Sequence, residues 1–145
     1  MVVDKVVKGL RKKGHQVFII SKKWELVDGT RPEMSQIISW DWSKDAAARA
    51  LKVKPDLVYI TQYWWEGASL FIPKKIPVVL MVTDLGFLET NLDLDMLYQM
   101  IDVWHKSIKR ADKFIVSGKI TKERMLIAFP QVKNKLIYIP LGADC

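Results

Sequence analysis

The sequence has one cysteine, Cys145, and two histidines, His15 and His105. A single thiol excludes an internal disulfide, and a chain without disulfides suits a reducing, intracellular setting. The two histidines are far apart in the sequence, and with no second cysteine they do not form a pattern of metal ligands. We therefore expect no metal centre and no catalysis that depends on one.

Long apolar runs, internal repeats and low-complexity segments are also missing. No apolar run approaches the roughly 20 residues that a membrane-spanning helix needs. The chain opens on a basic amphipathic pattern where a signal peptide would have an apolar core, so we expect no signal peptide. Its 145 residues are 50% hydrophobic and 27% charged, which is typical of one globular domain with its own core. We expect a cytoplasmic protein.

Acidic residues are outnumbered, and the formal net charge is +7. Such a charge is compatible with nucleic acid, an anionic membrane or an anionic substrate as partner. The lysines are spread over every predicted helix, which favours solubility as their role. No single element interleaves aromatic and basic residues, so we expect no nucleic-acid partner. The basic first helix, with Lys22 and Lys23, leaves peripheral contact with the inner membrane surface open.

Short apolar segments alternate with helical patterns along the chain. The predicted strands are Gln16–Ile20, Gln36–Trp40, Asp56–Thr61, Val78–Thr83, Lys113–Val116 and Lys135–Ile139. The predicted helices are Asp4–Lys13 ended by Gly14, Lys44–Lys52 capped by Ser43, a short turn at Gly67–Phe71, Asn91–Arg110, and a helix from Thr121, its cap, to Ala128. This alternation predicts a Rossmann-like α/β fold with a mostly parallel sheet and helices on both faces.

The central stretch is Pro77–Thr90, PVVLMVTDLGFLET. Its apolar, β-branched run Val78–Val82 predicts a strand buried on both faces. Thr83, Asp84 and Gly86 then fall at the carboxyl end of that strand. Ligands of open parallel sheets bind at this edge, so we expect any site to be there.

Five segments, in order along the chain, resemble a known family: RKKGHQVFII, KPDLVYI, IPVVLMVTDLGFLE, RADKFIVSGKITKERM and KNKLIYIPLGAD. They are similar to the N-terminal domain of retaining GT-B glycosyltransferases of the family 4 type. The resemblance implies an acceptor-side domain that faces a second Rossmann-like domain, which holds a nucleotide-sugar donor. It implies transfer of a sugar to a glycan or lipid-linked acceptor, without a cofactor and without a metal.

The chain departs from this family in three places. The opening strand and Gly-Gly loop that should precede Val2–Lys13 are missing, which leaves a strand position open and invites a homodimer. Thr83 stands where many members carry a histidine, so no catalytic residue is certain. On this resemblance, we expect residues 1–145 to form a single acceptor-side domain, without the donor-binding C-terminal domain. We expect inactivity without that half, in cis or in trans; the alternative is a non-catalytic, stand-alone binding or assembly module.

The expected acceptor contacts begin with Thr83, Asp84 and Gly86. A carboxylate at position 84 accepts hydrogen bonds from sugar hydroxyls. Alternatively, Asp84 caps the next turn and Gly86 serves the backbone geometry. Both interpretations stay open.

Aromatic residues crowd the carboxyl end of the preceding strand. Tyr63, Trp64 and Trp65 would stack on sugars or line a lipid-binding groove, although alternate members could fill the core instead. Ser117 and Gly118 follow a third strand and precede a helix. Free N–H groups there could hold an anion, or the pair could form an ordinary strand–helix turn.

Overall fold

The structure is a computed structural model of the chain, and it describes residues 2–20, 40–61, 66–83, 85 and 94–140. These residues form an α/β fold with an all-parallel sheet, as predicted. The strands are β1 (Val58–Ile60), β2 (Val78–Val82), β3 (Lys113–Val116) and β4 (Leu136–Tyr138). They lie side by side in the order in which they occur along the chain.

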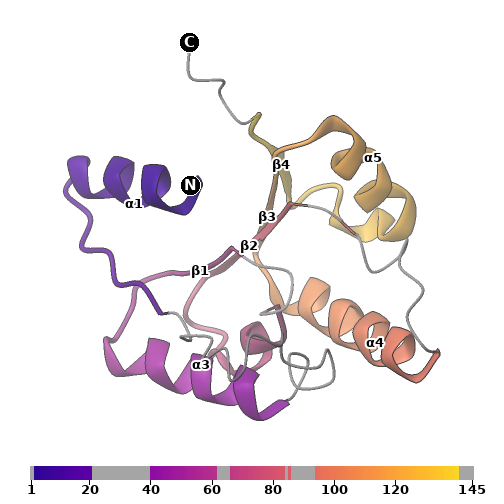
Figure 1. The fold of residues 1–145 in the computed structure, drawn as a ribbon, viewed down its shortest axis with the longest axis horizontal. Helices are drawn as coiled ribbons and strands as arrows, with labels where there is room; N and C mark the ends of the chain where they lie inside the picture. Colours follow the sequence, from indigo (N-terminus) through magenta and orange to yellow (C-terminus); the bar gives the residue numbers. More distant parts are fainter. Residues whose placement is uncertain (1, 21–39, 62–65, 84, 86–93, 141–145) are drawn as a thin grey trace, which may run out of the picture.

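Helices cover both faces of the sheet, as expected. They are α1 (Val2–Lys12), α3 (Trp40–Lys52), α4 (Leu94–Arg110) and α5 (Lys119–Ala128), with the short 3₁₀ helices η1 (Glu66–Phe71) and η3 (Pro130–Val132). Figure 1 shows α1 on one side of the sheet and α3, α4 and α5 on the other. Right-handed crossovers between strands in unreversed order put every connection on one face. The helix on the other side of the sheet, α1, is therefore not part of a crossover.

One predicted strand does not form among the described residues, and a second lies mostly outside them. Gln16–Ile20 is extended but pairs with no strand among the described residues. Its Phe18, Ile19 and Ile20 are 51%, 56% and 41% exposed. An extended segment becomes a strand only where a neighbouring backbone takes up its N–H and C=O groups, and here the Val17 carbonyl accepts instead from the Arg11 guanidinium at 3.0 Å.

The second predicted strand, Gln36–Trp40, lies mostly outside the described residues. Its last residue, Trp40, is the first residue of α3. The Trp40 ring packs edge-on against Phe71 at 5.9 Å between ring centroids, and the Lys106 ammonium lies 5.8 Å from the same ring. These contacts with η1 and α4 favour a helical residue at position 40, contrary to the prediction.

Two predicted helix caps serve other contacts. Because α3 begins at Trp40, Ser43 is a buried residue inside the helix. Because α5 begins at Lys119 with Gly118 as its N-cap, Thr121 is also inside its helix. The Thr121 hydroxyl donates to the Thr83 carbonyl at 3.1 Å. Both hydroxyl residues therefore face neighbouring segments, a role that the sequence pattern alone does not distinguish from capping.

The remaining elements agree with the prediction within one to three residues. Gly14 ends α1 with a φ of +87°, the left-handed conformation that glycine adopts readily. The turn at Gly67–Phe71 is η1. The predicted apolar stripe of α4 faces the core, with Met100, Trp104 and Ile108 buried.

The core lies between the sheet and the helices α4, α5 and η1. Leu80, Phe114 and Leu136 are register neighbours on β2, β3 and β4, and all belong to this cluster. Trp104 stacks on Phe129 with ring centroids 6.0 Å apart. The alternation of strand residues thus puts one side of the sheet entirely into the helical layer.

Arg110, the last residue of α4, fixes the amino edge of the sheet. Its guanidinium donates to the carbonyls of Ile72, Pro73 and Ile76 at 3.1, 2.9 and 2.8 Å. Asp112 accepts from the Val78 backbone N–H at 2.9 Å. The connection from η1 to β2 is therefore held to the end of α4 before the strand begins.

Candidate functional site

The carboxyl edge of the sheet is formed by the residues that follow each strand. Val82, Val116 and Tyr138 are register partners, so Thr83 and Ser117 lie level at the ends of β2 and β3. Ile60 pairs with Leu80, so β1 ends two residues earlier than β2. The structure therefore brings together two of the predicted site residues, Thr83 and Ser117, from segments 34 positions apart.

Gly118 sets the geometry of the turn from β3 into α5. It has φ −110° and ψ 142°, and no side chain caps the helix behind it. A Cβ atom at position 118 would lie 3.2 Å from Thr121 Oγ1, the hydroxyl that bonds the Thr83 carbonyl. The first-turn N–H groups of a helix have no partner within it, and α5 begins directly after β3 at this edge. The turn also links β2 to α5 through the bond from Thr121 to the Thr83 carbonyl.

Five predicted site residues lie outside the described residues: Tyr63, Trp64, Trp65, Asp84 and Gly86. The structure describes their flanks. Thr61 and Glu66 stand on either side of the aromatic segment, and Thr83 and Leu85 on either side of Asp84. Leu85 is 1% exposed, so the chain enters the core directly after position 84. The predicted contacts of these five residues stay predictions.

Glu66 is a residue of this region that the sequence analysis missed. It is 5% exposed, and its Oε2 has no hydrogen-bond partner among the described residues. Burial raises the pKa of Glu66 to about 8, and a hydrogen bond from its own backbone N–H opposes part of that rise. The carboxyl is therefore mostly protonated at neutral pH. The feature of the sequence that could have drawn attention to Glu66 is its position as a single acidic residue between Trp65 and the apolar residues of η1.

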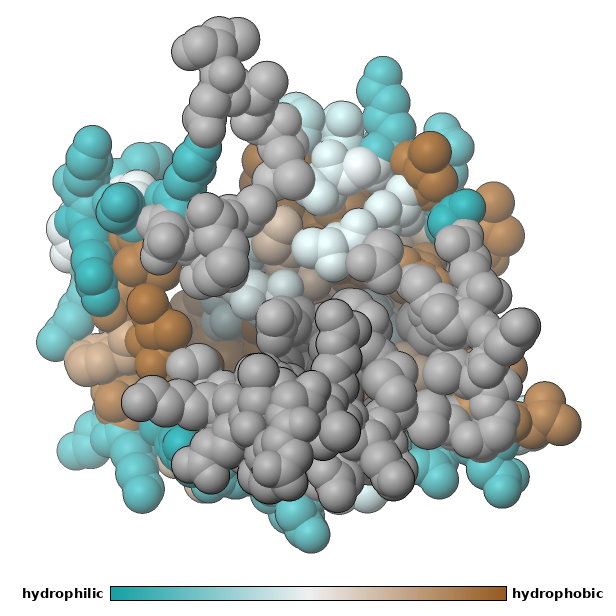
Figure 2. Space-filling model, viewed as in Figure 1, coloured by the Kyte–Doolittle hydropathy of each residue, from teal (hydrophilic) through white to brown (hydrophobic). Residues whose placement is uncertain are grey.

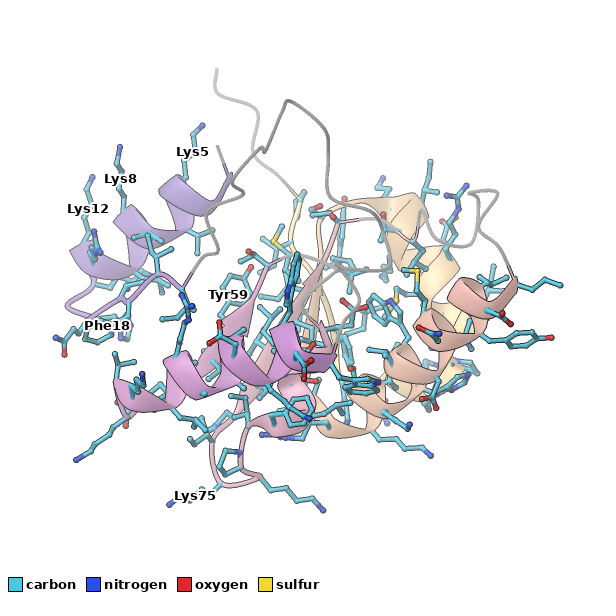
Figure 3. The ribbon with its side chains drawn as sticks, turned by 60° about the horizontal axis from the view of Figure 1, so that its bottom comes forward. Lys5, Lys8, Lys12, Phe18, Tyr59 and Lys75 are labelled. Atoms are coloured by element: carbon cyan, nitrogen blue, oxygen red, sulfur yellow. The ribbon has the colours of Figure 1, made fainter. Side chains whose placement is uncertain are left out.

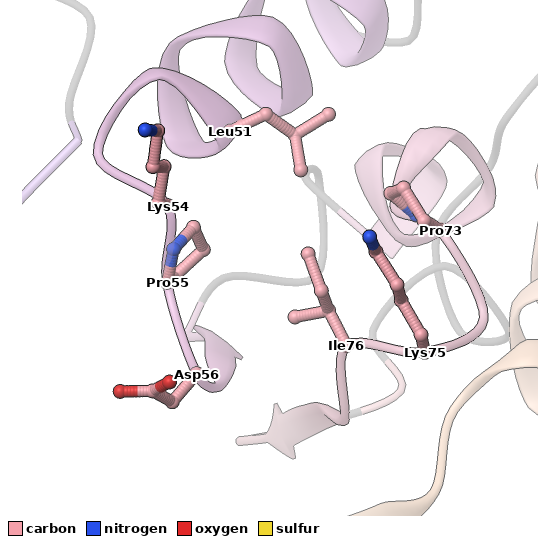
Figure 4. A pocket seen from close by; sticks show the side chains of 7 residues that line it. All are labelled: Leu51, Lys54, Pro55, Asp56, Pro73, Lys75 and Ile76. Atoms are coloured by element: carbon pink, nitrogen blue, oxygen red, sulfur yellow. The ribbon is translucent and has the colours of Figure 1, made fainter.

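A hollow of about 590 Å³ lies at the opposite, amino edge of the sheet. Figure 4 shows its lining, which comes from the segments before β1 and β2: Leu51, Lys54, Pro55, Asp56, Pro73, Lys75 and Ile76. Lys54 has a φ of +49° where the chain leaves α3. The hollow contains none of the predicted site residues, so it is separate from the carboxyl edge.

The first helix presents a basic face. In Figure 3 the side chains of Lys5, Lys8 and Lys12 point away from the sheet, whereas Phe18 lies on the other side of α1. Val7 is buried on the inner side of the helix. Figure 2 shows hydrophobic surface next to the hydrophilic side chains of α1, at the left of the view. The described helices include none that is long and apolar enough to cross a membrane.

Comparisons with protein-family models, curated proteins and solved structures find no significant match. In the part of the chain that the structure describes, no group of three or more His, Cys, Asp or Glu side chains could hold a metal ion. Among the described residues that directly follow β2 and β3, the polar groups at the carboxyl edge are the hydroxyls of Thr83 and Ser117 and the backbone groups. Such groups bind a polyhydroxylated or anionic ligand and do not themselves abstract protons near neutral pH.

Proposed function

We propose that this chain is the acceptor-side domain of a GT-B glycosyltransferase. With a C-terminal donor-binding half, it moves a sugar from a nucleotide-sugar donor to a glycan or lipid-linked acceptor. The observation that carries the proposal is the all-parallel sheet whose carboxyl edge holds Thr83 level with Ser117. The sequence resemblance assigns acceptor contacts to that edge, and parallel sheets bind ligands there.

In this proposal the domain binds and orients the acceptor, and the donor-binding half supplies the groups that act on the nucleotide-sugar donor. The Thr83 hydroxyl bonds an acceptor hydroxyl, and the Asp84 carboxylate accepts a second one. The bond from Thr121 to the Thr83 carbonyl holds the end of β2 against α5. Orientation of the acceptor toward the donor is the contribution expected of such a domain, because fixing two reactants removes much of the entropic barrier.

Asp84→Ala tests this role in the protein joined to, or mixed with, a donor-binding half. We expect sugar transfer to fall at least tenfold, with a larger effect on KM for the acceptor than on KM for the donor. Asp102→Ala is the matched control, because Asp102 is exposed on α4 and forms an ion pair with Lys106 on the same helix. Equal turnover of the two variants would show that Asp84 does not contact the acceptor.

The second candidate function is a non-catalytic binding or assembly module. The unpaired extended segment Gln16–Ile20, with its three exposed apolar side chains, favours it because such a segment pairs readily with another strand. Light scattering over a wide concentration range tests this reading. A stable dimer that binds no glycan and is not activated by any donor-binding half would support the module over the transferase.

The basic face of α1 supports an anionic membrane surface as a further partner. Lys5, Lys8 and Lys12 are spaced so that they share one side of the helix. Each lysine near an anionic surface contributes about 1 kcal/mol of attraction. Three of them give weak, salt-sensitive binding, which is suited to a domain that takes a lipid-linked acceptor from a membrane.

A further inference from the structure

The start of η1 is held between two helices. A Cβ atom at Gly67 would lie 2.7 Å from Ser43 Oγ on α3 and 3.5 Å from Val103 Cγ1 on α4. The Ser107 hydroxyl of α4 donates to the Glu66 carbonyl at 3.0 Å. We call this contact region, formed by Ser43, Glu66, Gly67, Val103 and Ser107, the η1 seam. Any side chain at position 67 would therefore clash with Ser43 while the seam is closed.

Glu66 itself is buried, and its carboxyl Oε2 has no hydrogen-bond partner in the described part of the structure. All but one of the charged or titratable groups on α3 and α4 are exposed, and none of the ion pairs between described residues includes Glu66. The exposed groups are Asp41, Lys44, Asp45, Arg49, Lys52, Asp95, Tyr98, Asp102, His105, Lys106 and Lys109. The exception, Arg110, is engaged by three backbone carbonyls and Asp112. An ionised carboxylate in this place would be buried and unpaired, which is strongly unfavourable.

We propose that Glu66 makes the η1 seam a proton-dependent switch: the seam is closed when the carboxyl is protonated, and loss of the proton favours an opening that brings the carboxylate into water. Glu66 is the first residue of η1, in the connection between β1 and β2, and it directly follows the predicted aromatic site residues in the sequence. Opening of the seam therefore frees one side of the carboxyl edge. The switch depends on the buried carboxyl and its surroundings, and it does not depend on the function proposed above.

The size of the effect follows from proton linkage. The closed seam keeps the Glu66 pKa at about 8, against an ordinary value of 4.5. At a pH between these two pKa values, Glu66 is ionised when the seam is open and protonated when it is closed, so opening releases one proton. The opening equilibrium constant then rises about tenfold for each pH unit and levels off above the higher value.

Hydrogen exchange of the η1 amides tests the switch. Peptides covering Glu66–Phe71 are followed by mass spectrometry at pH 5.5, 6.5 and 7.5, with correction for intrinsic exchange. We expect the opening constant of the wild type to rise about a hundredfold over this range, and that of Glu66→Gln to stay constant. Glu123→Gln, an exposed change on α5, should keep the wild-type slope. A wild type without a slope, or the same slope in Glu66→Gln, would overturn the proposal.

A second measurement uses the unmodified chain and does not depend on how the variant folds. The side-chain carboxyl of Glu66 is followed by carbon-13 NMR while pH is raised from 4 to 9. A midpoint near 8, with exchange broadening of η1 signals over the same range, supports the switch. A midpoint near 4.5 would show that the carboxyl is solvated and would overturn it.

Discussion

Replacement of Arg110 by alanine should destabilise the domain more than loss of any exposed charge. The side chain is 9% exposed and donates to the carbonyls of Ile72, Pro73 and Ile76. A typical hydrogen bond contributes about 1 kcal/mol net. Two of the three bonds are partly buried and count fully, whereas water can replace the exposed bond to Pro73. We expect a loss of about 2–3 kcal/mol from the free energy of unfolding.

Urea denaturation at pH 7, followed by tryptophan fluorescence, measures this loss. Arg110→Lys should lose about half as much, because one ammonium cannot reach all three carbonyls in the guanidinium geometry. Arg49→Ala is the control: its ion pair with Asp45 is half exposed and should contribute less than about 0.5 kcal/mol. If Arg110→Ala costs no more than Arg49→Ala, Arg110 does not hold the η1–β2 connection, and the reasoning is wrong.

Three further predictions concern the seam and the basic face. Gly67→Ala should lower the free energy of unfolding by about 1–3 kcal/mol through overpacking, and Ser43→Ala in the same chain should restore part of it; an unchanged thermal midpoint in the single variant would contradict this. The pKa of Glu66 is raised to about 8 in the folded chain. The protonated carboxyl therefore contributes its full stabilisation to the folded state below the pKa of an unfolded glutamate, and this stabilisation is lost as the pH rises to 8. Glu66→Gln should therefore remove a slope of about 1.4 kcal/mol per pH unit from urea-measured stability over pH 5–8, and parallel curves would refute it. A variant in which glutamate replaces Lys5, Lys8 and Lys12 should no longer co-sediment with vesicles containing 30% phosphatidylglycerol. The control, in which glutamate replaces Lys52, Lys74 and Lys75, has the same net charge and should still co-sediment. Equal loss of binding in both variants would indicate an effect of net charge only.

The sequence pattern predicts what depends on local chemistry. Val78–Val82 is apolar and β-branched over its whole length, and Lys113–Val116 is bounded by turn residues, so both are strands as expected. Gly14 ends α1 because the conformation there suits glycine. The level ends of β2 and β3 follow from parallel pairing, which explains why Thr83 and Ser117 were expected at one edge.

The errors came from residues whose role depends on distant partners. Gln16–Ile20 has the composition of a strand, but composition does not supply the neighbouring backbone that a strand needs. Ser43 and Thr121 have the side chains of helix caps, yet each faces a segment far away in the sequence. Glu66 is acidic and so would be expected at the surface. Its burial depends on α3 and α4 meeting around η1, which no short pattern encodes.

The unreversed strand order has a consequence for synthesis of the chain. Each described strand pairs with the next one along the sequence, from β1 to β4. During translation, β1 and β2 can pair while the residues of β3 are still in the ribosome, and each later strand adds to an existing template. Parallel strands need a crossover of about a dozen or more residues between them, so each pairing forms only after the whole crossover segment has been made. The sheet is thus suited to grow from β1 toward β4, and each newly added strand becomes the edge to which the next described strand pairs.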